Sequence, residues 1–204
     1  EFRNTAADDY ANRCLYAAIA LLLFGSFGRH LVVLLLSNRR KNEDEPKMVD
    51  PPKWSVLDRA HGTKLHIEES GNPNGQAMIF VHGWNATSQE WYYQRKHFAK
   101  NYRLILFDMA GLGKSTRPSN KDFSLPKLAK DLNAVIEFTG AKNPILWGHS
   151  IGGMTILTLV AKHKEMIQGS IKALVLQHTT YTNPLRTIIF SKLMTAIQKP
   201  VLQP

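Results

Sequence analysis

The sequence predicts an α/β protein in which a mostly parallel sheet is covered by helices on both faces. From residue 53 onward, short apolar runs of strand length alternate with segments of helical periodicity, and this alternation is typical of parallel sheets. A lone serine also stands between two glycines, in the stretch 148–152, where an apolar run of strand length gives way to a helical one. Because functional residues of such sheets lie at the carboxyl ends of the strands, we expect the site there.

The composition is that of a packed globular protein of one domain. Of the 204 residues, 44% are hydrophobic and 21% are charged. The net charge of +10 falls within residues 51–204, which hold 19 of the 26 basic and 9 of the 16 acidic side chains. The lysines are scattered and lack interleaved aromatic residues, so we expect no nucleic-acid binding. Cys14 is the only cysteine, which excludes an internal disulfide and a cysteine-rich metal site.

The amino-terminal region predicts a single-pass membrane anchor. After a flank at residues 1–13, the apolar stretch 14–36 is long enough to cross a bilayer as a helix. Arg29 costs about 2.5–3.5 kcal/mol on insertion scales, and the surrounding aliphatic residues offset it. The flanking charges favour a cytoplasmic location for the rest of the protein, which follows a linker at 37–52. The alternatives are the apolar core of a signal peptide and translated sequence ahead of a start at Met48.

Turn and periodicity signals place the elements of the globular part. Two strand-like runs, Trp54–Asp58 and Lys64–Glu69, flank a turn and predict a hairpin. An amphipathic helix is expected between Ser124 and Gly140, which carry the signals of a helix start and a helix end. Further strands are predicted at 77–81, 102–107, 145–147 and 171–176, and further helices at 90–100 and 154–161.

Ser150 is the candidate nucleophile. It lies in the pattern Gly-x-Ser-x-Gly, at the predicted turn from strand to helix. Such a turn strains the serine backbone and needs small neighbours, which Gly148 and Gly152 supply. The serine side chain is then exposed at the carboxyl edge of the sheet.

Three motifs at their spacing resemble the amino-terminal half of the α/β-hydrolase fold, in its serine-nucleophile branch (AB hydrolase-1 type). They are His82-Gly83-Trp84 after the third strand, 108–115 after the fourth, and 148–153 after the fifth. The resemblance implies a hydrolase core at 53–180 with a sheet that ends after its sixth strand. Residues 181–204 would then be the start of an inserted lid.

The resemblance also implies the roles of the site residues. The backbone N–H groups of Trp84 and Ile151 would form the oxyanion hole beside Ser150. The catalytic acid and histidine of this family usually follow later strands, so none of the few candidates after the serine is assigned: His163, Glu165 and His178. We therefore expect the 204-residue chain alone to be inactive, because a serine without a positioned base is a poor nucleophile.

The expected function is that of an esterase-like or lipase-like serine hydrolase that cleaves a small acyl substrate through an acyl-enzyme on Ser150, with no cofactor and no metal. The alternatives are a membrane-anchored binding module without turnover, a carbon–carbon hydrolase and a cofactor-free haloperoxidase. Epoxide hydrolases of this fold use aspartate at the elbow, so Ser150 counts against them. The Gly-Lys-Ser at 113–115 is not a phosphate loop, because Asp108 stands where that pattern requires glycine.

Overall fold

The computed structural model describes residues 5–28, 30, 32–33, 46–163 and 170–182. The chain divides into two compact units, residues 1–46 and 47–204. The expected lid at 181–204 lies almost wholly outside the described residues, as does most of the expected linker.

Among the described residues of the first unit, no helix matches the membrane-spanning helix expected at 14–36. Helix α1 runs over Thr5–Leu23 and passes into a short π-helical segment, η1, at Phe24–Gly28. It therefore begins inside the expected polar flank, where Asp9 and Arg13 form an ion pair of 2.9 Å. None of the described helices combines the length and the apolar character needed to cross a membrane.

The second unit holds one sheet of six strands, ordered β1-β2-β4-β3-β5-β6. Strands β3 to β6 are mutually parallel, whereas β1 and β2 form an antiparallel hairpin that joins the sheet through β4. This arrangement confirms the predicted α/β class and the predicted hairpin. The strands are β1 Lys53–Asp58, β2 Lys64–Gly71, β3 Gln76–Val81, β4 Tyr102–Phe107, β5 Ile145–His149 and β6 Ala173–Gln177.

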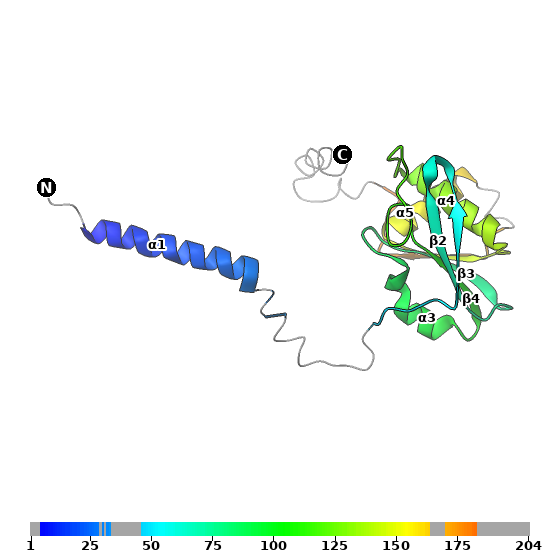
Figure 1. The fold of residues 1–204 in the computed structure, drawn as a ribbon, viewed down its shortest axis with the longest axis horizontal. Coiled ribbons are helices and arrows are strands. Elements are labelled where there is room, and N and C mark those ends of the chain that lie inside the picture. Colours follow the sequence, from blue (N-terminus) through cyan, green and yellow to red (C-terminus); the bar gives the residue numbers. More distant parts are fainter. Residues whose placement is uncertain (1–4, 29, 31, 34–45, 164–169, 183–204) are drawn as a thin grey trace. The chain divides into compact units, whose positions relative to one another are not determined.

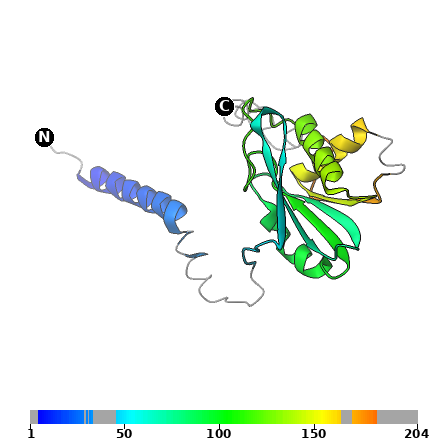
Figure 2. The same cartoon turned by 45° about the vertical axis from the view of Figure 1, so that its right-hand side comes forward.

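Helices cover both faces of this sheet (Figures 1 and 2). Helix α3, Tyr92–Phe98, lies on one face, and α4, Leu125–Thr139, and α5, Ile151–Lys162, lie together on the other. Short 3-10 turns at Ala60–Gly62 (η2) and Ser88–Trp91 (η3) complete the described elements. The helix expected at 90–100 is thus a 3-10 turn followed by a shorter α-helix.

Each face of the sheet has its own hydrophobic core. The larger core joins the sheet to α4 and α5, and the smaller core, which combines aromatic and aliphatic side chains, lies under α3. In the smaller core the Phe80 ring lies 5.1 Å from that of Trp91 and 5.7 Å from that of Trp147. Burial of apolar side chains on both faces fixes the sheet between the two helix layers.

The parallel register brings the ends of three strands to one edge of the sheet. Val81 of β3 pairs with Phe107 of β4 and with Gly148 of β5. The residues that follow these strands, beginning at His82, Asp108 and His149, therefore meet at the carboxyl ends. The three sequence motifs lie in these segments.

Candidate active site

Ser150 occupies a strained turn between β5 and α5. Its backbone has φ 51° and ψ −119°, in a region that residues with a side chain rarely adopt and that costs about 1–3 kcal/mol. Its N–H donates to the carbonyl of Gln177 at 3.0 Å. Its carbonyl accepts from the N–H of Met154 at 3.2 Å and from the hydroxyl of Thr179 at 2.6 Å. Bonds on both sides of the residue hold the strained conformation in place.

Two glycines allow β5 and α5 to approach as closely as this turn requires. A Cβ atom on Gly152 would lie 2.1 Å from the carbonyl oxygen of Val81, and one on Gly148 would lie 2.6 Å from the Gly152 backbone. Contacts this short leave no space for any side chain. The small residues on either side of Ser150 are therefore a packing requirement of the elbow.

The loop after β3 lies directly against this elbow. A Cβ atom on Gly83 would stand 3.7 Å from the Cβ of Ser150 and 2.8 Å from Nδ1 of His149. Trp84 follows in the loop, with 58% of its surface exposed. In the described part of the chain, no protein acceptor takes a hydrogen bond from the N–H of Trp84 or of Ile151. Two free amides thus lie in the two segments that meet at the serine.

His82 orients the peptide that carries the Trp84 N–H. Its Nδ1 donates to the carbonyl of Gly83 at 2.8 Å, and its Nε2 accepts from the N–H of Met109 at 2.9 Å. These two bonds require the neutral ring with hydrogen on Nδ1. Burial lowers the pKa of His82 below its usual value, against the opposing effects of the Gly83 bond and of the Asp108 and Glu90 charges. His82 is a structural, uncharged part of the loop.

Glu90 connects the loop to the elbow, and sequence reasoning did not single it out. Its Oε2 accepts from the N–H of Gly83 at 2.8 Å, and its Oε1 lies in close contact with Nδ1 of His149. The alignment of that second contact is not that of a hydrogen bond. The partners lie in three separate segments of the chain, so no local sequence signal could have identified the contact.

His178 and Thr179, after β6, complete the surroundings of Ser150. The rings of His178 and His149 meet edge to face with centroids 6.0 Å apart. Thr179 packs against Gly153 as well as donating to the serine carbonyl. Of the other two residues left unassigned, His163 lies at the end of α5, and Glu165 is outside the described residues.

The loop from Asp108 to Ser115 is bonded to itself and to its neighbours. Asp108 accepts from the N–H groups of Ser88 at 2.7 Å and Lys114 at 2.8 Å, and a Cβ atom on Gly113 would collide with its carboxylate. A phosphate loop needs free amides that point at an anion. Here the carboxylate of Asp108 already takes two of the nearby amides, which agrees with an organising role for this residue.

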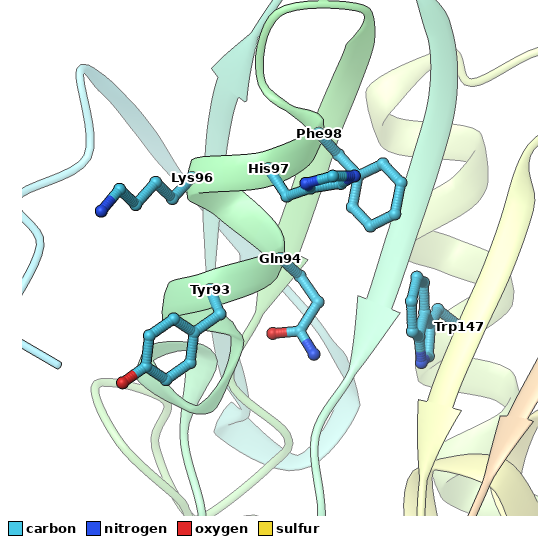
Figure 3. Close-up of a pocket in the computed structure, with 6 residues that line it drawn as sticks. All are labelled: Tyr93, Gln94, Lys96, His97, Phe98 and Trp147. Carbon is cyan, nitrogen blue, oxygen red and sulfur yellow. The ribbon is translucent and has the colours of Figure 1, made fainter. Parts of the chain in front are cut away.

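The structure also has an open groove of about 650 Å³ between α3 and β5, which does not include the serine. Figure 3 shows Gln94, His97 and Phe98 extending from α3 on the side of Trp147. The Phe98 and Trp147 rings lie 5.6 Å apart. This groove lies on the α3 side of the sheet, and none of its lining residues contacts Ser150 through a hydrogen bond given above.

Metal ligands do not gather near the serine or elsewhere in the described ranges. No group of three or more His, Cys, Asp or Glu side chains there could hold a metal ion. The arrangement around Ser150 consists of backbone amides, a hydroxyl, two imidazole rings and one carboxylate. These groups suit attack on an electrophilic carbon and stabilisation of a negative oxygen.

Comparison with known proteins identifies the family. The family model of the alpha/beta hydrolase fold matches residues 76–196. The chain belongs to this family. Its curated relatives include "Epoxide hydrolase 1" of Caenorhabditis elegans, 28% identical over 154 residues that make up 74% of this chain and 36% of the relative. A "Non-heme haloperoxidase" of Rhodococcus erythropolis is 29% identical over 130 residues, 60% of this chain and 46% of the relative.

Solved structures of α/β hydrolases share the same arrangement. A putative aryl esterase from Burkholderia cenocepacia matches with TM-score 0.59 and 29% identity, over 65% of this chain and 49% of the esterase. An esterase from Exiguobacterium antarcticum matches with TM-score 0.54 and 30% identity, over 61% of this chain and 45% of the esterase. The chain thus spans less than half the length of these relatives.

Proposed function

We propose that this chain carries the nucleophile and the oxyanion-binding amides of a serine hydrolase that cleaves a small acyl ester or a related bond. The observation that carries the proposal is the strained backbone of Ser150, φ 51° and ψ −119°, on a turn from strand to helix. Strain of this kind persists only where the surrounding structure holds it, and it is concentrated at functional sites. A nucleophile elbow presents its serine in this way.

In the proposed reaction, Oγ of Ser150 attacks the acyl carbon and the carbonyl electron pair moves to the oxygen. The N–H groups of Trp84 and Ile151 donate to this oxyanion, and the loss of one such donor typically costs about 10²- to 10³-fold in rate. The alcohol leaves with a proton as the acyl-enzyme forms, and water then releases the acid. The base that takes the serine proton, and the acid that orients the base, are proposed to follow the sixth strand in the complete protein.

The residue at the elbow separates this proposal from epoxide hydrolysis. Several relatives carry the name epoxide hydrolase, but the resemblance implies an aspartate nucleophile for that reaction. This chain has Ser150 at the elbow. A relative named as a non-heme haloperoxidase favours halogenation as the second candidate, because the resemblance implies the same serine for both reactions.

The nucleophile assignment predicts covalent labelling of one side chain. A fluorophosphonate should label the complete protein, and Ser150→Ala should abolish the labelling, because the reagent forms a bond only with an activated nucleophile. Ser119→Ala, in an exposed loop, is the matched control and should be labelled like the wild type. Equal labelling of the Ser150→Ala variant would contradict the assignment. Ester hydrolysis and peroxide-dependent bromination, measured on the same samples, would separate the two candidate reactions.

A further inference from the structure

We propose that Glu90 is a positioning residue that holds the two oxyanion-binding segments at a fixed separation. This inference rests on the proposed function of Ser150. One carboxylate oxygen of Glu90 accepts from the N–H of Gly83 at 2.8 Å, and the other contacts Nδ1 of His149. Gly83 directly precedes Trp84, and His149 directly precedes Ser150. A single side chain thus connects the loop after β3 to the end of β5.

The contact with Gly83 fixes a part of the chain that would otherwise rotate. Glycine has more backbone freedom than any other residue, and the Trp84 N–H belongs to the peptide that follows Gly83. His82 holds the carbonyl of that peptide at 2.8 Å, while Glu90 holds the N–H of the peptide before it. Because a trans peptide is planar, with its N–H opposite to its C=O, fixing both neighbouring peptides sets the direction of the Trp84 N–H.

Glu90 is itself carried by a rigid element. It lies in the 3-10 turn η3, whose first residue, Ser88, is held on both sides: its N–H donates to Asp108 at 2.7 Å and its carbonyl accepts from Arg95 at 3.1 Å. Trp91, the last residue of η3, is 1% exposed. A positioning side chain acts only if its own backbone is fixed, and η3 meets this condition.

Two substitutions separate the effect of the length of the Glu90 side chain from the effect of its charge. Glu90→Gln keeps the length and one acceptor oxygen for Gly83, but it removes the negative charge that faces His149. Glu90→Asp keeps the charge, but it is one methylene too short to maintain both contacts. If positioning is the role of Glu90, the longer neutral side chain should work better than the shorter charged one. Both substitutions are conservative, so the folded state should survive them.

The test measures the rate of fluorophosphonate labelling of Ser150 in the complete protein, together with kcat and KM for p-nitrophenyl acetate. We expect Glu90→Ala and Glu90→Asp to lower the labelling rate constant by about 10- to 100-fold, because small displacements of a reacting site have effects of this size. The loss should fall on kcat with KM nearly unchanged. Glu90→Gln should stay within a few-fold of the wild type.

Gln89 provides the control within the same turn. Its side chain bonds to the backbone of Val49, with Oε1 accepting at 2.9 Å and Nε2 donating at 3.1 Å, instead of to the site. Gln89→Ala should therefore label at the wild-type rate. Two outcomes would overturn the inference, provided that Ser150→Ala still abolishes labelling. In the first, Glu90→Ala and Glu90→Asp are labelled at the wild-type rate. In the second, Glu90→Gln is labelled as slowly as Glu90→Asp. Labelling that survives in Ser150→Ala would instead overturn the proposed function itself.

Discussion

Gly152 is packed so closely against β3 that no side chain fits between them. A Cβ atom there would lie 2.1 Å from the carbonyl oxygen of Val81, which is backbone and cannot rotate away. Gly152→Ala should lower the free energy of unfolding by about 3 kcal/mol or more, at the upper end of the range for overpacked sites. Urea unfolding of the wild type and the variant measures this change.

Gly140 is the matched control for this substitution. It has φ 61° and no atom within 4 Å of a Cβ built on it, so alanine would add backbone strain without a collision. Gly140→Ala should cost only about 1–2 kcal/mol. If Gly152→Ala were at least as stable as Gly140→Ala, β3 would have moved aside to make room. The conclusion that the elbow has no space for a side chain would then be wrong.

The sequence could predict the roles of the elbow residues but not the role of Glu90. Ser150, Gly148 and Gly152 form one short pattern whose meaning depends on the local turn, so sequence alone placed them at the elbow. Glu90 acts through Gly83 and His149, which come from two other segments. Only the folded sheet brings these groups together, so no pattern in the chain could indicate the contact.

At the scale of elements, a buried ion pair attaches α3 to the sheet. Glu68 of β2 is fully buried and contacts Arg95 of α3, which is 5% exposed. Arg95 also donates to the carbonyl of Ser88 at 3.1 Å, and His66 approaches Glu68 at 3.2 Å. In the described part of the chain, Nε and Nη1 of Arg95 are buried without a partner. The contacts of Glu68 and Arg95 therefore do not fully offset the free-energy cost of removing both charges from water.

This pair predicts a pronounced non-additivity between two substitutions. Arg95→Leu alone should lower the free energy of unfolding by about 3–5 kcal/mol, because it leaves the Glu68 carboxylate buried without its cation. Adding Glu68→Leu should recover most of that loss, since both charges are then gone. Urea unfolding of the wild type, both single variants and the double variant measures the coupling energy.

A surface pair on the same hairpin supplies the control. Asp58 and Lys64 lie 3.0 Å apart with side chains 77% and 58% exposed, and Asp58→Ala should change stability by no more than about 1 kcal/mol. If the double variant at 68 and 95 were as unstable as Arg95→Leu alone, the loss would come from packing, and the account based on charge burial would be wrong.

Sequence reasoning located most elements but missed the way η3 and α3 divide. Helix α4 begins and ends where Ser124 and Gly140 predicted it, because start and end signals act within a single turn of helix. The segment 90–100 was expected to be one helix. It forms a 3-10 turn and a shorter α-helix, and Asp108 and Arg95 hold Ser88 at the start of that turn. Such tertiary bonds override a local preference for helix.

At the scale of the whole molecule, the alternation of strands and helices predicted the sheet and its two covered faces. The strand order, β1-β2-β4-β3-β5-β6, depends on which elements bury each other, and periodicity along the chain does not show this. The amino-terminal prediction rested on hydropathy alone. Hydropathy located an apolar stretch at 14–36, whereas α1 starts at Thr5 within charged sequence and ends at Leu23.

The two outer strands of the described sheet differ in how they meet solvent. β1 begins at Lys53 and ends at Asp58, and the side chains of these residues are 67% and 77% exposed. Exposed charges on an edge strand discourage pairing with another chain. The described β6, Ala-Leu-Val-Leu-Gln, has no charged residue and exposes 42% of Leu176. Among the residues that the structure describes, no strand pairs with the outer edge of β6, which leaves backbone groups unpaired beside apolar side chains.

We therefore expect the 204-residue chain to self-associate through β6. Leu176→Lys should shift the chain toward monomer, because a charge on an edge strand costs desolvation when another strand pairs with it. Val56→Lys is a closely matched control, since Val56 of β1 is also 42% exposed but lies on the edge that already carries charges. Sedimentation velocity over a range of concentrations measures both effects. A monomeric wild type, or an equal response to the two lysines, would show that association does not depend on the β6 edge.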